Sequence, residues 1–339
     1  MHIGRNYSLI EVLKWTRRYI YIFIVISSIP VLIYELMGHV WISIPWLPIA
    51  LIGTAVAFLV SFKNNASYDR MWEARKIWGA IVNSSRSWTI MVKDFITNEY
   101  AKNPATEEEL KAIKERMVLR HVAWLTALRH QLRQHKPWES QMKKSNQEYR
   151  QKFPTPELMS SLQDDITPYL STEEKTYILS KGNRASHIIS LQSTELKALK
   201  MRGLIDDFRH MELQKMLVDL YTQQGKSERI KNFPYPRQYA TINRYFIWLF
   251  VILVPFGMMQ EFMKLGIHMA WLTIPFSTVV AWVFHTMELV GESSENPFEG
   301  GPNDIPITSM SRGIEIDIRQ MLDEEDLPAQ IEATNTILM

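Results

Sequence analysis

The chain contains no cysteine, which excludes disulfide bonds, thiolate zinc sites, iron–sulfur clusters and a cysteine nucleophile. It also lacks an excess of either charge. Lys and Arg total 38 against 36 Asp and Glu, and a net charge of +2 offers no broad basic surface for nucleic acid. No glycine-rich phosphate loop, H-E-x-x-H or G-x-S-x-G motif occurs. We therefore predict no nucleic-acid partner, no cofactor and no bound metal.

Side chains suited to acid–base catalysis are also poorly grouped. The nine histidines are scattered, and we expect the closest group, His121, His130 and His135, to be solvated on a polar helix. Adjacent carboxylates at 164–165 and 206–207 point in different directions from a helix, so neither pair resembles a general acid and base. These patterns predict that the protein is not an enzyme.

Charged residues are nearly absent from two pairs of apolar segments. Between Arg18 and Lys63 the only formal charge is Glu35. A helix needs about 20 apolar residues to cross the hydrocarbon layer, and two of the segments reach that length while the other two are extendable. Buried helices of a large soluble domain would explain one short run but not the set. We predict four transmembrane helices, built on residues 19–37, 42–62, 245–260 and 265–287.

Basic residues flank these segments unevenly. The connections near 38–40 and 261–266 hold only Lys264, whereas the other flanks hold Lys14, Arg17, Arg18, Lys63, Arg70, Arg75, Lys76, Lys231, Arg237 and Arg244. Positively charged flanks stay on the cytoplasmic side of a membrane. Both termini and the long middle segment are therefore expected in the cytoplasm.

The middle segment is polar and mostly helical by pattern. Apolar residues recur at three- and four-residue spacing over 67–88 and 109–134, which predicts two long amphipathic helices. A third helix is expected over 187–224, ending at Gly225, and prolines predict short helices and loops over 136–184. The expected domains are 1–62 with two spans, a cytoplasmic helical domain at 63–240, two further spans at 241–290 and a cytoplasmic C-terminal segment at 291–339.

Three sequence blocks then become specific. They read NNASYDRMWEARKIWGAIVNSSRSW at 64–88, ERIKNFPYPRQY at 228–239 and ENPFEGGPNDIP at 295–306. In this order, and with four spans, they resemble the bestrophin family of ion channels, most closely its prokaryotic members. The resemblance implies an all-α homopentamer around one central pore in a bacterial inner (plasma) membrane. Its signature residues here are Arg70, Trp72, Glu73, Trp78, Gly79, Asn296, Pro297, Phe298 and Asp304.

The resemblance also implies a narrow neck lined by three side chains of the second span, the last of them eight residues before the signature Arg70. This places the neck at Thr54, Phe58 and Phe62. Positions four residues apart lie nearly in line on a helix, so five copies would stack three rings. A narrow apolar constriction closes a pore by dewetting. The alternative for the two phenylalanines is packing against lipid or another helix.

Thr54 departs from the family pattern, whose first neck position is usually a larger aliphatic residue. Its hydroxyl is expected to be easier to wet, so the barrier is expected to rest on Phe58 and Phe62. A second constriction in similar channels lies at the cytoplasmic end, and the resemblance places it at Phe208, preceded by Asp206 and Asp207. The alternative for Phe208 is an ordinary core position.

Animal members of the family are opened by calcium, held partly by an acidic run after the N-P-F block. Asn296 and Asp304 are present here, but 300–302 reads Gly-Gly-Pro in place of most of that run, and Ser293 replaces an expected glutamine. Calcium takes roughly six to eight oxygen ligands, several of them carboxylate. Too few remain, and we expect no calcium site.

The expected function is the passage of small monovalent ions, and anions such as chloride are favoured. Phenylalanine rings present a positive edge to anions, whereas Asp206 and Asp207 would attract cations, so a sodium or potassium channel of the same fold stays open. The expected partners are further copies of the chain, membrane lipid and the ions.

Two other classes of protein also stay open. One is a membrane-anchored scaffold that binds a cytoplasmic partner through its long helices. The other is a membrane enzyme, for which the spans offer only Glu35, His39, His268 and His285. Glu35 and His39 stand one turn apart, where a vestibule or a contact between subunits is favoured over chemistry.

Overall fold

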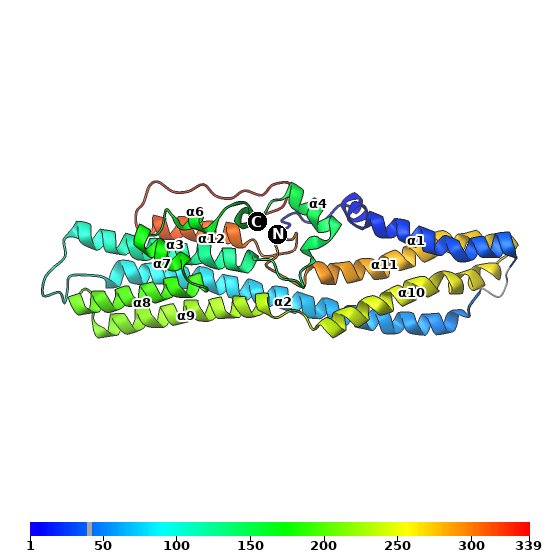
Figure 1. Ribbon diagram of the computed structural model, residues 1–339, viewed down its shortest axis with the longest axis horizontal. Helices are drawn as coiled ribbons and strands as arrows, with labels where there is room; N and C mark the ends of the chain where they lie inside the picture. The colour runs from blue at the N-terminus through cyan, green and yellow to red at the C-terminus, as the bar shows by residue number, and fades with distance from the viewer. Residues whose placement is uncertain (39–42) are drawn as a thin grey trace. The chain divides into compact units, whose positions relative to one another are not determined.

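The computed structural model describes residues 1–38 and 43–339 (Figure 1). His39 and most of the predicted connection near 38–40 lie outside these ranges. Within them the fold is all-helical, as predicted, and β pairing is limited to isolated bridges of Ile337 with His2 and Thr334. The chain forms two compact units: unit 1 comprises 1–3, 71–233 and 297–339, and unit 2 comprises 4–70 and 234–296.

Unit 2 contains the apolar helices. α1 begins after a capping box between Ser8 and Glu11 and ends at Gly38 in the left-handed conformation. Four helices are long and apolar enough to cross a membrane, which confirms the predicted number: Leu9–Met37, Trp46–Phe95, Arg237–Met263 and His268–Ser293. The helical elements are α1 (Leu9–Met37), the first part of α2 (Trp46–Phe95), α10 (Arg237–Met263), η3 (Ile267–Leu272) and α11 (Thr273–Ser293).

The core of unit 2 is formed where these helices pack on one another. α10 contributes four of its nine residues and α2 three, and α1 and α11 contribute Phe23 and Ala281. The other members are Ile49, Val56 and Val60 of α2 and Ile247, Phe250, Val251 and Val254 of α10. Large apolar side chains outside this core remain exposed on all four helices, as expected for helices that meet lipid or further copies of the chain.

Unit 1 is a bundle of long helices, and several short helices pack against α3 (Glu107–Arg133) and α8 (Arg184–Arg202). The long helices bury tryptophans at Trp78, Trp88 and Trp124, and α8 and α9 run side by side (Figure 1). The long elements are the second part of α2, α3 (Glu107–Arg133), α8 (Arg184–Arg202), α9 (Asp207–Asn232) and α12 (Ile307–Gln320). The short ones, in the region where prolines predict them, are η2 (Ser140–Met142), α4 (Lys144–Lys152), α5 (Pro156–Met159), α6 (Leu162–Ile166) and α7 (Thr172–Leu179).

The single helix predicted over 187–224 is wrong, because the chain turns in the middle of it. Gly203 ends α8 with a φ of +73°, and a Cβ there would lie 2.5 Å from the Tyr100 carbonyl oxygen. Asp206 then caps α9 by accepting a hydrogen bond from the Arg209 backbone N–H at 2.7 Å. Gly225, the predicted helix end, lies inside α9.

The prediction that the three closest histidines are solvated is wrong for His121. This side chain is buried, and its Nε2 lies 2.8 Å from the Ser85 hydroxyl. Burial lowers the pKa of His121 to about 3, so its imidazole is neutral at physiological pH. His130 contacts Asp165 at 2.7 Å. The histidines of α3 are therefore structural parts of unit 1.

Candidate functional site

The part of α2 in unit 2 has a packed face and an open face. Phe58 is 64% exposed and Phe62 is 68% exposed, and Thr54 is exposed as well. The buried residues of the same stretch recur at three- and four-residue spacing, at Ile49, Gly53, Val56, Val60, Lys63 and Ser67. The three predicted neck residues thus share the open face, which either a pore or lipid would have to cover. Their role at the neck stays a prediction.

Close helix packing sets the rotation of α2. A Cβ on Gly53 would lie 2.7 Å from Cε2 of Phe250, so only glycine lets α2 approach α10 this closely. Val56 and Val60 continue the same packed face. Because successive residues rotate by about 100° around a helix, this packing turns Phe58 to the opposite side.

The hydroxyl of Thr54 is already engaged within its own helix. Its Oγ1 donates to the carbonyl oxygen of Ala50 at 3.0 Å. Pore water would therefore meet an oxygen whose hydrogen is committed, along with the threonine methyl group. This bond reduces the wetting that the sequence predicts for Thr54.

A buried ion pair follows the predicted neck. Lys63 Nζ donates to Glu288 Oε1 at 2.5 Å, and the two side chains are 3% and 6% exposed. Asn243 donates to the other carboxylate oxygen, so α2, α10 and α11 are joined at one point. Lys63 directly follows Phe62, so this junction holds the register of α2 beside the neck.

This junction is the main feature of the site that the sequence patterns do not reveal. Glu288 follows the predicted apolar segment 265–287 by one residue, so counting polar groups inside the segments does not find it. The positions of these residues relative to the apolar segments do indicate the junction. Lys63 and Glu288 each follow the end of an apolar segment, and Asn243 precedes the start of one. Because α10 runs in the opposite direction to α2 and α11, all three residues lie at the same level.

The three signature blocks meet in space. In unit 2, Arg70 of the first block donates through Nε to the Glu295 carbonyl oxygen at 3.0 Å, and Arg237 of the second block contacts the Glu295 carboxylate at 2.7 Å. Burial raises the pKa of Glu295, against the opposing effect of Arg237. In unit 1, Glu73 of the first block pairs with Arg229 of the second. The blocks therefore act as connectors between segments distant in sequence.

The remaining signature residues have different surroundings. Trp78 and Phe298 are buried in the core of unit 1, and Asp304 is buried as well. Trp72 is half exposed, and the space around Gly79 is open. Pro297 accepts a hydrogen bond from the Ile305 N–H through its carbonyl at 3.2 Å, which closes the loop that follows α11.

The predicted cytoplasmic aperture lies at the start of α9. Phe208 is 81% exposed in the first turn, so it is not a core residue of the single chain. Asp206 caps the helix, Asp207 pairs with Lys200, and Arg209 pairs with Glu99 at 2.6 Å. The two carboxylates that would attract cations are thus accompanied by two basic side chains.

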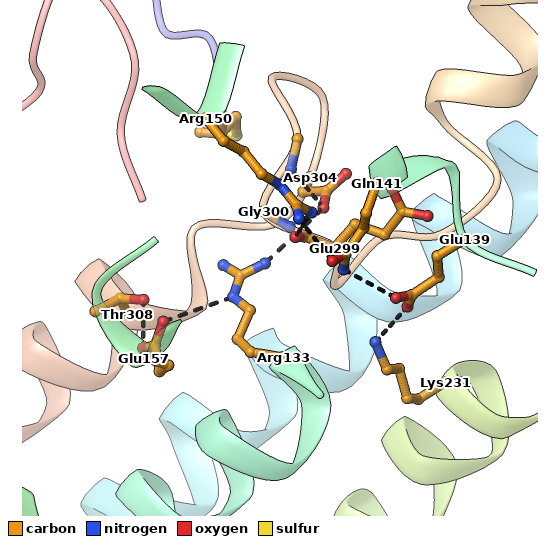
Figure 2. Close-up of polar contacts among 12 residues, drawn as sticks. Arg133, Glu139, Gln141, Arg150, Glu157, Lys231, Glu299, Gly300, Asp304 and Thr308 are labelled. Atoms are coloured by element: carbon orange, nitrogen blue, oxygen red, sulfur yellow. Dashed lines mark hydrogen bonds and ion pairs between the residues drawn. The ribbon is translucent and has the colours of Figure 1, made fainter. Parts of the chain in front are cut away.

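The strip at 296–306, where calcium binds in animal relatives, is surrounded by basic side chains. Figure 2 shows Arg133 and Arg150 reaching it from two helices, with Lys231 joined to the neighbouring Glu139. Arg150 donates to the carbonyl oxygen of Glu299 at 2.8 Å, and an Arg133 nitrogen lies 3.9 Å from the Asp304 carboxylate. Lys231 pairs with Glu139, which neighbours the strip.

The carboxylate oxygens of this cluster are already occupied by internal donors. Asp304 accepts from the backbone N–H groups of Gly300 and Gly301 at 2.6 and 2.9 Å. Glu299 accepts from the backbone and hydroxyl of Ser140 at 2.9 and 3.1 Å. Across the described ranges, no group of three or more His, Asp or Glu residues is arranged to hold a metal ion. The donor set of this cluster therefore does not fit calcium.

Glu299 makes this cluster sensitive to pH. Burial, reinforced by repulsion from Asp304, raises its pKa from 4.5 to about 7. The stabilisation from the neutral form is present below pH 4.5 and lost as the pH rises through 7, because the folded state binds a proton that the unfolded chain has released. At pH 8, Glu299→Gln is expected to be more stable than the natural protein by up to about 3 kcal/mol, measured by denaturant titration in detergent.

Glu332→Gln, at an exposed position, is the control for this measurement. The natural protein and the control should lose stability between pH 5 and 8 more steeply than Glu299→Gln. Identical pH slopes for all three would show that Glu299 is ionised in the folded protein.

Four apolar helices and an all-helical polar unit define an integral membrane protein, and its fold is that of a solved bacterial protein. The crystal structure of a bestrophin homologue from Klebsiella pneumoniae matches with a TM-score of 0.74 at 23% sequence identity, covering 90% of this chain and 98% of that chain. A family model described as bacterial/fungal bestrophin protein matches residues 11–320. The chain belongs to this bestrophin family, which confirms the resemblance of its three blocks.

Two relatives are named as channel-forming proteins. The chain is 27% identical over 293 residues to the voltage-dependent anion channel-forming protein YneE of Escherichia coli K12, covering 86% of this chain and 82% of YneE. It is also 27% identical over 307 residues to the voltage-dependent anion channel-forming protein RSc3414 of Ralstonia nicotianae, covering 88% and 87%. Both relatives carry the names of channels and not of enzymes.

Proposed function

We propose that this protein is a homopentameric channel that passes small monovalent anions such as chloride through a hydrophobic neck formed by Thr54, Phe58 and Phe62. The observation that carries the proposal is the exposure of both phenylalanines on one face of an apolar helix. Five such faces around an axis would give a narrow apolar constriction that dewets. The names of the relatives support the choice of anions.

The acids at the predicted aperture are paired with basic side chains, which weakens the argument for cations. Asp206 and Asp207 alone would concentrate cations near Phe208, but Lys200 and Arg209 lie beside them and offset that field. Asp206 also uses an oxygen to cap α9, which fixes its carboxylate to the helix end. Because Arg209 also pairs with Glu99, three acids face two basic side chains here, so the exit itself does not select anions and the ring edges at the neck set the preference.

For topology we propose that unit 1 and both termini are cytoplasmic and that the membrane is a bacterial inner membrane. The basic flanks of the four spans support this orientation. The domain scheme 1–62, 63–240, 241–290 and 291–339 goes with it.

The deciding experiment is a planar-bilayer recording of the purified full chain, with chloride and sodium varied separately, together with native mass spectrometry of the detergent complex. Current with a reversal potential that follows chloride, from a pentamer, supports the proposal. A reversal potential that follows sodium would make the protein a cation channel of the same fold. No current from an intact oligomer would favour the membrane-anchored scaffold.

Asp206→Asn/Asp207→Asn tests the aperture. Asparagine keeps the helix cap of Asp206 but removes both negative charges, which leaves Lys200 without its acid while Arg209 keeps Glu99. We expect the reversal potential under an asymmetric chloride gradient to move by several millivolts toward the chloride equilibrium potential. The control is Glu212→Gln, an exposed acid of α9 paired with Lys215. An unmoved reversal potential would remove the aperture from the selectivity argument.

A further inference from the structure

A polar cavity of about 210 Å³ lies in unit 1. The end of α3, the start of α8 and the end of α9 contribute its walls. Its charged and titratable lining residues are His130, Lys136, Arg184, Glu228 and Lys231. The volume exceeds that of a few waters but falls below the pockets that take drug-sized or nucleotide-sized ligands. The cavity therefore suits a small polar ligand.

The single carboxylate among these residues, Glu228, accepts hydrogen bonds from side-chain amides. One oxygen of Glu228 accepts hydrogen bonds from Gln131 and Gln224, each at 2.7 Å, and from Asn183 at 3.1 Å. Three amide donors disperse its negative charge, and no lysine or arginine is paired with it in the part of the chain that the structure describes. Glu228 keeps its negative charge but is not paired with Arg184 or Lys136, and the lining carries three lysine or arginine side chains against this one carboxylate.

Two cations of the lining are without a carboxylate partner in the described ranges. Arg184 has a buried Nε that donates to nothing there. The Lys136 ammonium lies 6.0 Å from the centre of the Trp138 ring and makes no ion pair in the described ranges, although the Lys136 backbone N–H donates to Glu139. The other two basic groups are paired, His130 with Asp165 and Lys231 with Glu139. The buried Nε is closed to a water-sized probe, so the attraction of the cavity for an anion rests on the unpaired charges of Arg184 and Lys136.

Arg184 is also the first residue of α8, a helix of 19 residues. The positive end of its dipole adds to the charge of the side chain at the same place. The planar guanidinium matches two oxygens of a tetrahedral anion, and the lysine ammonium suits a third.

We propose that this cavity is a binding site for a small oxyanion of the phosphate class, held by Arg184 and Lys136. The site is separate from the ion path proposed above and does not depend on it. Binding of an anion to this cavity can therefore be measured on the purified protein without measuring ion flux.

The test is calorimetric titration of inorganic phosphate into the full chain in detergent, at constant ionic strength set with chloride. Saturable binding is expected in the natural protein. Arg184→Gln and Lys136→Gln should each weaken it by about tenfold, since each removes a charge-assisted hydrogen bond. Glu228→Gln should strengthen it, because it removes the only negative charge of the lining while keeping an acceptor for the amides. Glycerol 3-phosphate, run in parallel, shows whether the free ion or an organic phosphate is preferred.

Arg202→Gln is the matched control, because Arg202 ends the same helix and is paired with Glu109 on the surface. It should bind phosphate like the natural protein. Arg184→Gln should unfold at an unchanged or higher temperature without phosphate, since its loss leaves no acid unpaired, and this separates lost binding from lost folding. Absence of saturable binding, or equal binding by Arg184→Gln and the natural protein, would overturn the proposal.

Discussion

Replacing Phe58 and Phe62 together with alanine is expected to raise chloride flux from reconstituted liposomes by about tenfold or more. Both side chains are largely exposed on the open face of α2, so truncating them leaves no cavity in the core of unit 2. What changes is the width and wettability of the proposed throat. A barrier lower by about 1.4 kcal/mol already gives a tenfold rise in rate.

Phe246→Ala is the control for this measurement, since Phe246 is an exposed phenylalanine of α10 and belongs to no proposed neck position. It should leave the flux near that of the natural protein. Equal flux from the natural protein and the double variant, with the oligomer intact, would show that these phenylalanines do not gate and would favour their packing against lipid.

Lys63→Met is expected to destabilise the protein by about 3–5 kcal/mol. The substitution leaves the carboxylate of Glu288 buried without its lysine at the junction of α2, α10 and α11, where Asn243 still donates to it. A buried charge without its partner costs far more than the pair contributes. The measurement is the unfolding midpoint of the detergent-solubilised protein in a denaturant titration.

The double variant Lys63→Met/Glu288→Met should recover most of that loss, because both charges are gone and apolar side chains fill the space. Lys264→Met, which breaks the exposed pair of Lys264 with Glu261, is the control and should cost under about 1 kcal/mol. A Lys63→Met protein as stable as the control would mean that Glu288 is neutral in the fold.

The spans of this protein are readable from composition because the apolar membrane interior demands long uncharged helices. Those segments are visible between Arg18 and Lys63 without any knowledge of contacts. The pairing of Lys63 with Glu288 joins residues 225 positions apart, and no local pattern indicates it. The pairing could be inferred only by comparing how deep in the membrane the charged residues at the ends of different spans lie. That depth follows from the topology of the spans.

The failures within unit 1 have a similar cause. Apolar spacing continues across Gly203, so a periodic pattern predicts one helix where Gly203 and Asp206 separate α8 from α9. Gly225 resembles a helix end, yet the packing of α9 on its neighbours continues past it. His121 lies on a helix with many polar residues, but its side chain is buried and contacts Ser85 of α2. Sequence spacing does not show this contact.

The open face of α2 could be located only as far as the family pattern allowed. Spacing alone groups Thr54, Phe58 and Phe62 on one side of a helix, and it gives no reason to choose that side over any other. The contact between Gly53 and Phe250 supplies the reason, since it places the opposite side of α2 against α10.

The strip at 296–306 is held by cations that belong to the same chain. Tethering keeps Arg133, Arg150 and Lys231 at a local concentration that dilution of the surrounding solution does not change, unlike a dissociable ion. A chelator would therefore leave this loop in place. The occupancy that does vary near neutrality is that of the proton on Glu299.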